Sequence, residues 1–151
     1  METNTIVTKV APAKRILYTG KTKTIGGRDG GASVSSDGHL NIKLATPGRA
    51  QVGTNPEQLF AAGWSACFIG ALKIAASKVK VQFPEQASVN AEVDLVLTND
   101  QYSLQARLLV NLPGLDNITA QSLVEAAHAT CPYSKATRGN IDVAITVNTE
   151  S

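Results

Sequence analysis

The chain has 151 residues and a formal net charge of +2, and 17% of its residues are charged, against roughly 25% in an average soluble domain. This length fits one domain of ordinary size and leaves no room for a second catalytic domain. The basic residues are spread along the chain without a run of four, so we expect no nucleic-acid partner.

The beginning of the chain predicts a loose arm over residues 1–14, followed by a single domain over residues 15–151. Residues 1–15 lack the apolar stretch of a secretory signal, so we expect a cytoplasmic protein. The longest uncharged and mostly apolar run, residues 59–72, is shorter than a bilayer span. It predicts a buried helix and no membrane insertion.

Three short β elements are predicted first. Residues 15–24 are Thr-rich and β-prone, and a glycine-rich loop over residues 26–31 follows, with Arg28 and Asp29 at its centre. Residues 32–36 and 39–45 then flank Asp37-Gly38, a dipeptide typical of a tight hairpin.

A long helix is predicted next. Asn55 is a good N-cap, Pro56 suits the first helical position, and Glu57 is favourable at the positive end of the helix dipole. The helix should run to about Lys78. Its apolar middle, rich in Ala and Gly, predicts a helix at the centre of the fold that is packed on every side.

The second half of the chain predicts a hairpin, a helix and a last strand. Apolar and polar residues alternate over residues 89–97 and 102–112, on both sides of Asn99-Asp100. A helix over residues 119–131 should end at Cys131, because Pro132 disfavours helical geometry in the residue before it. Residues 141–147 alternate again. The order β-β-β-α-β-β-α-β indicates an α+β fold.

Cys67 and Cys131 are the two cysteines of the chain. They can be two unrelated buried thiols, which behave as small apolar side chains. A permanent disulfide is disfavoured in the cytosol, and the spacing lacks the paired ligands of a zinc site, so we expect no metal. The remaining interpretation is a redox pair, in which one thiol attacks and the other resolves.

A redox role requires a cation near Cys67, because burial in an apolar helix raises a thiol pKa. The candidates are Arg28, Arg49 and Arg138, and Glu57 could orient an arginine through a bidentate pair. However, ten residues of straight helix separate Glu57 from Cys67 by roughly 15 Å. One arginine could contact both only if the helix bends, for which Gly63 is a possible point.

Two further interpretations concern chemistry at Cys131 and the source of electrons. His128 and Cys131 are spaced i, i+3 on one helix face, which could form the Cys-His pair of a hydrolase. The chain has no dinucleotide-binding fingerprint, so the electrons of a redox reaction must come from an external reductant.

Three ordered motifs resemble those of organic hydroperoxide resistance proteins, the Ohr branch of the OsmC/Ohr family. The resemblance extends from about Arg15 to Val147. Trp64 departs from it, because the family commonly has Tyr there. The first motif is Gly26-Gly27-Arg28-Asp29-Gly30. The second consists of residues 53–63 followed by Ser65-Ala66-Cys67-Phe68. The third begins at Ala127-His128, includes Cys131-Pro132-Tyr133-Ser134 and ends with residues 136–143.

The resemblance implies an OsmC-like fold in an intertwined homodimer, with the site at the subunit interface. It implies a thiol peroxidase that reduces alkyl and fatty-acid hydroperoxides to alcohols, with no bound cofactor and with dihydrolipoamide or a lipoylated protein as the reductant. Cys67 would be the peroxidatic thiol and Cys131 the resolving thiol. Arg28 would stabilise the thiolate, and Glu57 would hold Arg28.

Apolar neighbours of Cys67, namely Leu59, Phe60 and Phe68, are expected to receive the alkyl chain of the substrate. Two other functions stay open at this point. One is the osmotically inducible branch of the family, with broader peroxide use. The other is a non-enzymatic redox sensor, in which oxidation of Cys67 changes a partner contact.

Overall fold

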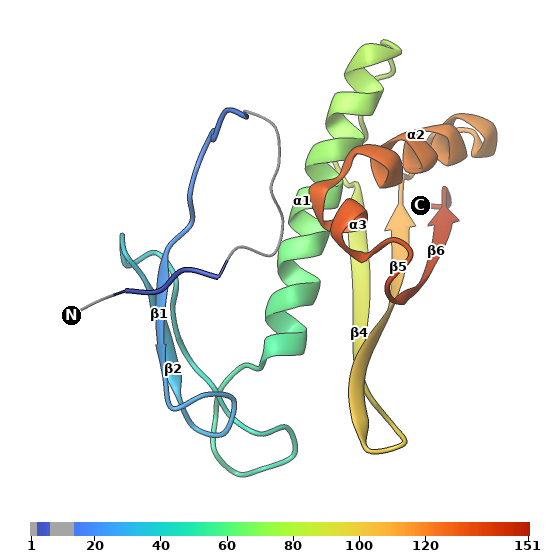
Figure 1. Cartoon of the computed structure of the whole chain (residues 1–151). Coiled ribbons are helices and arrows are strands. Elements are labelled where there is room, and N and C mark those ends of the chain that lie inside the picture. Colours follow the sequence, from blue (N-terminus) through green and yellow to red (C-terminus); the bar gives the residue numbers. More distant parts are fainter. Residues whose placement is uncertain (1–2, 7–13) are drawn as a thin grey trace.

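Two three-stranded sheets flank a long helix in the computed structural model, which describes residues 3–6 and 14–151 (Figure 1). The first sheet is antiparallel and contains β1 (Thr22–Ile25), β2 (Ala32–Ser35) and β3 (Asn41–Lys43). In the second sheet, β4 (Ser88–Thr98) and β5 (Gln101–Asn111) are antiparallel, and β6 (Asp142–Asn148) runs parallel to β5. The helices are α1 (Pro56–Lys78), α2 (Asn117–Thr130) and α3 (Pro132–Thr137). The predicted α+β class is confirmed.

The β4–β5 hairpin forms one side of the core, and α1 and α2 pack against it. Its turn residues Asn99 and Asp100 have φ values of 51° and 62°, the left-handed conformation that a tight hairpin turn requires. Leu108 and Val110 point to the helix-covered face and are fully buried in the core that α1 and α2 also line. In the alternating pattern that predicted this hairpin, the apolar residues are therefore the ones on the face that meets the helices.

Helix α1 begins as the sequence predicts, because the Asn55 side chain accepts a hydrogen bond from the Gln58 amide at 2.9 Å. One face is buried in the core: Trp64, Phe68, Ala71, Leu72, Ala75 and Ala76. The opposite face is exposed within this chain: Ala62, Ala66, Gly70, Lys73, Ile74 and Ser77. The prediction that α1 is packed on every side is therefore wrong for a single chain.

Helix α1 also meets the length and hydropathy criteria of a membrane-spanning helix. Core helices of folded proteins meet the same criteria, and here the buried face of α1 packs against β4 and α2.

The segment between β5 and β6 contains one helix more than predicted. Helix α2 starts at Asn117 rather than Thr119, because Asp116 accepts a hydrogen bond from the Thr119 amide at 2.9 Å. It ends at Thr130, and Cys131 has extended backbone angles. Pro132, which predicted the end of α2, also occupies the first position of α3.

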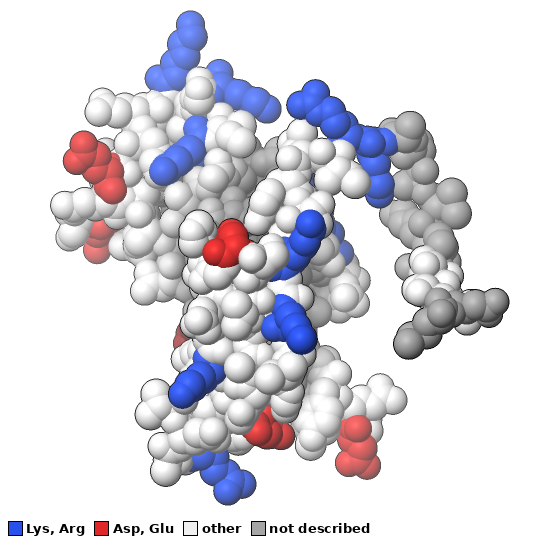
Figure 2. Space-filling model, turned by 90° about the vertical axis from the view of Figure 1, so that its left-hand side faces the viewer, with Lys and Arg blue, Asp and Glu red and all other residues white. Residues whose placement is uncertain are grey.

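The β1–β3 sheet packs little against the described remainder of the chain. Its strands are shorter than predicted, since residues 15–21 form no strand and β3 covers only Asn41–Lys43. Large apolar side chains around it are exposed, namely Ile16, Leu17, Tyr18, Ile25 and Val52. Figure 2 shows that charged residues are scattered over this side of the molecule and that most of the surface is uncharged. The predicted arm, residues 1–14, lies largely outside the described residues.

Candidate active site

The two cysteines lie together between α1 and the α2–α3 junction. Cys67 is partly buried in the middle of α1, and Cys131 is fully buried in the core. Both are free thiols, and they are close enough for Cys131 to shift the Cys67 pKa. One thiol is thus accessible, and the other is held directly behind it.

The position of Cys131 follows from the two helices that meet at it. Its amide donates to the Ala127 carbonyl at 2.7 Å, and its own carbonyl accepts from the Lys135 amide at 2.9 Å. Pro132 prevents α2 from continuing, so the chain turns at Cys131 and begins α3. The resolving candidate is therefore fixed by backbone hydrogen bonds on both sides.

Helix α3 is in turn fixed to α1. The Trp64 indole Nε1 donates to the Ser134 hydroxyl at 3.2 Å, and both side chains are fully buried. The Tyr133 ring lies over Gly63, where an added Cβ would come within 3.4 Å of the ring. Gly63 therefore gives room for Tyr133 in an unbroken helix, rather than a bend.

Burial raises the Cys67 pKa most. A hydrogen bond that the Cys67 thiol donates to Cys131, and charge repulsion between the two thiolates, raise it further. The Tyr133 backbone amide opposes this shift through a hydrogen bond that favours the thiolate. Within this chain the balance keeps Cys67 protonated at a higher pH than a free thiol. The site needs a further cation to generate a reactive thiolate at neutral pH.

Arg28 and Glu57 form the second pair that the structure brings together. Their side chains are joined by an ion pair at 2.5 Å, with Glu57 the more buried partner. Arg28 comes from the glycine-rich loop after β1, and Glu57 from the first turn of α1. The loop is tight, because a Cβ on Gly31 would lie 2.2 Å from the Ile25 carbonyl oxygen. Only glycine fits there.

The structure does not join the two pairs within the described part of one chain. Arg28 and Glu57 line a cavity of about 460 Å³ beside β4, whereas Cys67 lines another cavity. Helix α1 runs without interruption from Glu57 to Cys67, so the roughly 15 Å separation expected from helical rise applies. Arg28 is accordingly absent from the groups that shift the Cys67 pKa.

The cavity that Cys67 lines has a volume of about 500 Å³ and lies between α1 and α2. None of the three predicted alkyl-binding residues is on its wall. Phe68 is fully buried in the core, and Phe60 packs against Trp64 and Tyr133 with ring centroids 5.6 and 6.3 Å away. Leu59 is partly buried in the first half of α1.

The residues that line this cavity were not predicted. From α1 they are Cys67, Gly70, Ala71, Ile74, Ala75 and Lys78, and from the α2–α3 region they are Ala126, Thr130 and Pro132. The α1 members recur every three or four residues after Cys67, which is the spacing of one helix face. That spacing is a signal from which the sequence could have predicted them.

The structure disfavours a Cys-His hydrolase. Cys131 is fully buried, so an ester cannot reach its thiol, and the His128 Nδ1 atom has no hydrogen-bond partner among residues 3–6 and 14–151. Burial and the charge of Arg138 lower the His128 pKa, and the Arg138 guanidinium donates to the His128 carbonyl. Arg138 thus connects α3 to α2 instead of activating a thiol.

No group of three or more His, Cys, Asp or Glu side chains in the described part of the chain is arranged to hold a metal ion.

Comparison with known proteins agrees with the fold and with the motifs. Residues 46–146 match the family of OsmC-like proteins. The organic hydroperoxide resistance protein of Xanthomonas axonopodis pv. citri is 45% identical over 142 residues, which cover 91% of this chain and 99% of that protein. The crystal structure of the organic hydroperoxide resistance protein OhrB of Bacillus subtilis superposes with a TM-score of 0.82 at 42% identity, covering 87% of this chain and 99% of that chain.

The fold and these matches define an OsmC-like protein. Within that class, the chain belongs to the organic hydroperoxide resistance branch of the OsmC/Ohr family.

Proposed function

We propose that this chain is a thiol peroxidase that reduces organic hydroperoxides, both alkyl and fatty-acid, to alcohols. The observation that carries the proposal is the arrangement of the two thiols. Cys67 is accessible at an apolar cavity, and Cys131 is buried within reach behind it. This is the order that an attacking and a resolving thiol require.

In the proposed reaction the Cys67 thiolate attacks the distal oxygen of the hydroperoxide. The O–O bond breaks, Cys67 becomes a sulfenic acid, and the alkoxide leaves and takes up a proton to form the alcohol. The Cys131 thiol then attacks the sulfenic sulfur, a disulfide forms, and water leaves. Two electrons have passed from the thiols to the peroxide.

The disulfide must be reduced from outside the chain. We propose a lipoyl-type dithiol, either dihydrolipoamide or a lipoylated protein, which becomes oxidised to its own disulfide as the two thiols are restored. This exchange fits a cytoplasmic protein, because the cytosol maintains a pool of reduced thiols.

We further propose that the working unit is an intertwined homodimer. The β1–β3 sheet packs little against the other described residues of its chain and carries exposed apolar residues. The first half of the exposed face of α1 contains Ala62 and Ala66, whose small side chains allow a second helix to approach closely. A second copy would cover this part of α1 and the β1–β3 sheet.

A dimer would also complete the site. If two α1 helices cross antiparallel at Ala62, residue 57 of one helix is level with residue 67 of the other, since both are five residues from the crossing point. The Arg28–Glu57 pair of one subunit would then face the cysteines of the other. Arg28 of the partner subunit would supply a cation, which the described residues of its own chain do not give to Cys67.

Two cysteine variants test the reaction. Cys67→Ser should consume no peroxide. Cys131→Ser should consume about one equivalent of an alkyl hydroperoxide per subunit and then stop, because the sulfenic acid has no thiol to condense with. Full multiple turnover with dihydrolipoamide in Cys131→Ser would contradict the resolving role.

Mixed dimers test the shared site. Arg28→Ala and Cys67→Ser subunits are coexpressed, and the mixed dimers are purified through two different tags. If the arginine and the cysteines of a site come from different subunits, each mixed dimer should contain one intact site. Such dimers should recover about half of the wild-type rate. A site built within one chain would leave both sites defective, so an inactive mixed dimer would contradict the shared arrangement.

A further inference from the structure

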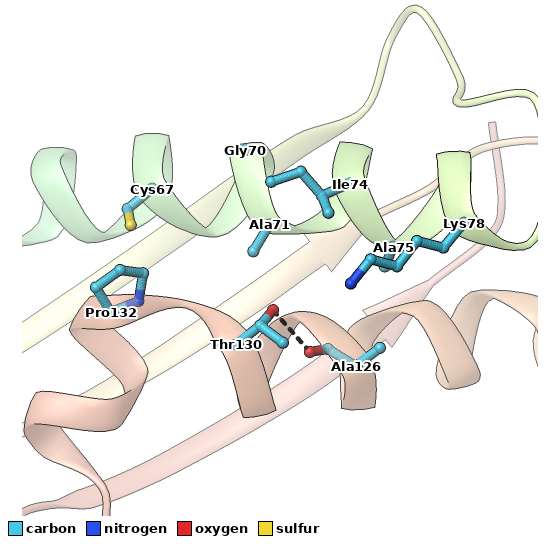
Figure 3. A pocket seen from close by; sticks show the side chains of 9 residues that line it. All are labelled: Cys67, Gly70, Ala71, Ile74, Ala75, Lys78, Ala126, Thr130 and Pro132. Atoms are coloured by element: carbon cyan, nitrogen blue, oxygen red, sulfur yellow. Dashed lines mark hydrogen bonds between the residues drawn. The ribbon is translucent and has the colours of Figure 1, made fainter. Parts of the chain in front are cut away.

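The cavity beside Cys67 is long and has different chemistry at its two ends. Figure 3 shows the Cys67 sulfur at one end and the Lys78 side chain at the other, with α1 above and α2 below. Cys67 and Lys78 are eleven residues apart on one helix, which is about 16 Å along its axis. The volume of about 500 Å³ is within the range of small-molecule sites.

The wall between the two ends is apolar. It is formed by Gly70, Ala71, Ile74 and Ala75 of α1 and by Ala126 of α2. The one hydroxyl on the wall, that of Thr130, is already used in a hydrogen bond to the Ala126 carbonyl at 3.0 Å (Figure 3). A chain of methylene groups suits this wall, whereas a polar ligand would lose its hydrogen bonds to water there.

The Lys78 ammonium has no carboxylate within 4 Å in the described part of the chain. A lysine in the last turn of α1 is favourable to the helix dipole wherever its side chain points. Figure 3 shows the side chain directed back along the cavity toward Ala75. This direction places a positive charge over the apolar wall.

We propose that Lys78 binds the carboxylate of a fatty-acid hydroperoxide whose alkyl chain lies along this cavity, and so determines which carbon presents its peroxide to Cys67. The inference rests on the proposed peroxidase function and adds the residue that would position such a substrate in this cavity. An ammonium at one end, an apolar wall and a thiol at the other end match the three parts of such a molecule.

The length of the cavity sets the position of the peroxide. The Lys78 side chain leans toward the N-terminus of α1, so the span from its ammonium to Cys67 is shorter than the separation along the axis. With C–C bonds of about 1.5 Å in a zigzag, on the order of ten carbons cover this span. A mid-chain hydroperoxide therefore fits better than one near the carboxylate.

Kinetics on matched substrates test the role of Lys78. Lys78→Gln should raise KM for a mid-chain fatty-acid hydroperoxide about five-fold at unchanged kcat, because one partly exposed charge pair is lost. The methyl ester of the same hydroperoxide and tert-butyl hydroperoxide should be unaffected. Lys78→Arg should restore the preference for the acid.

Lys80→Asn is the matched control. Lys80 is two residues away and does not line the cavity, its φ of 57° suits asparagine, and the variant has the same net charge as Lys78→Gln. Equal KM values for the acid and the ester in the wild type would overturn the proposal. So would an equal rise in KM for the acid in Lys78→Gln and in Lys80→Asn.

A binding measurement separates this inference from the peroxidase function. Palmitate, which has no peroxide, should slow alkylation of Cys67 in the wild type and in Lys80→Asn, and should protect several-fold less in Lys78→Gln. Methyl palmitate should not distinguish the variants. A protein that turns over no hydroperoxide but shows this pattern would contradict the proposed function and support the Lys78 site. Equal protection by palmitate in all variants would overturn the Lys78 site even in an active peroxidase.

Discussion

Trp64 and Ser134 are 70 residues apart in sequence, yet the indole of one donates a hydrogen bond to the hydroxyl of the other at 3.2 Å in the fully buried core. This bond connects the middle of α1, three residues before Cys67, to α3, three residues after Cys131. This buried hydrogen bond therefore adds a polar contact to the apolar packing that fixes the two elements that carry the thiols.

Ser134→Ala should destabilise the protein, because it leaves the Trp64 N–H buried without a partner. The free energy of unfolding should fall by about 1–3 kcal/mol. Urea unfolding measures this, with Ser122→Ala on the exposed side of α2 as the control. If the two variants were equally stable, the bond would have no structural role.

Gly31→Ala should disrupt the loop that carries Arg28. Its Cβ would lie 2.2 Å from the Ile25 carbonyl oxygen, so the backbone must shift. We expect peroxide turnover to fall as it does in Arg28→Ala. Gly20→Ala is the control, because its Cβ would meet nothing closer than 3.7 Å. Wild-type turnover in Gly31→Ala would show that the geometry of this loop is unimportant.

Arg28→Ala should shift the pH dependence of Cys67 alkylation. Burial and Cys131 raise the Cys67 pKa, and Arg28 of the partner subunit is proposed to oppose them. Without that cation the thiolate should appear only at higher pH, with a midpoint about one to three units above that of the wild type. Alkylation rates measured across the pH range test this. An unchanged midpoint would show that Arg28 does not lie close enough to Cys67 to affect its pKa.

Asp94→Asn should lower stability at neutral pH but not in strong acid. Hydrogen bonds from Arg107 and then Gln105 lower the Asp94 pKa from 3.8 to about 2. The ionised form is thus favoured in the folded state. The contribution of this ionised carboxylate to the stability of the fold is present above the pKa that Asp94 has in the unfolded chain. It is lost as pH falls through the pKa that Asp94 has in the folded state.

The difference in melting temperature between wild type and Asp94→Asn should therefore be present at about pH 6, shrink as pH falls below about 4, and disappear below about pH 2. Glu125→Gln, at an exposed carboxylate on α2 that makes no ion pair within the described residues, is the control and should show no such change. A difference that persists in strong acid would contradict the ion-pair explanation.

Local signals in the sequence predicted the elements that depend on local physics. Asn55 and Pro56 determine where α1 begins. Asn99-Asp100, between two alternating segments, determines where the β4–β5 hairpin turns. Helix α3 was missed because Pro132 was interpreted only as the end of α2, although the same residue starts the next helix. Six residues are also too few for a helical periodicity to appear.

The site was predictable only in part, because its parts meet through tertiary structure. Helical rise alone indicated that Glu57 and Cys67 are far apart, and the unbroken α1 agrees with that distance. The predicted alkyl-binding residue Phe68 faces the core instead, because the sequence does not show which face of an all-apolar helix its own chain covers. The exposed face of α1 becomes visible only in three dimensions.

The most direct test of the proposed function is peroxide consumption by the reduced protein over many turnovers, with dihydrolipoamide as the reductant. An alkyl hydroperoxide and hydrogen peroxide should be compared at equal concentration. The two thiols beside an apolar cavity predict sustained turnover with a strong preference for the alkyl hydroperoxide. Stoichiometric oxidation of the thiols without turnover, or equal rates with both peroxides, would contradict it.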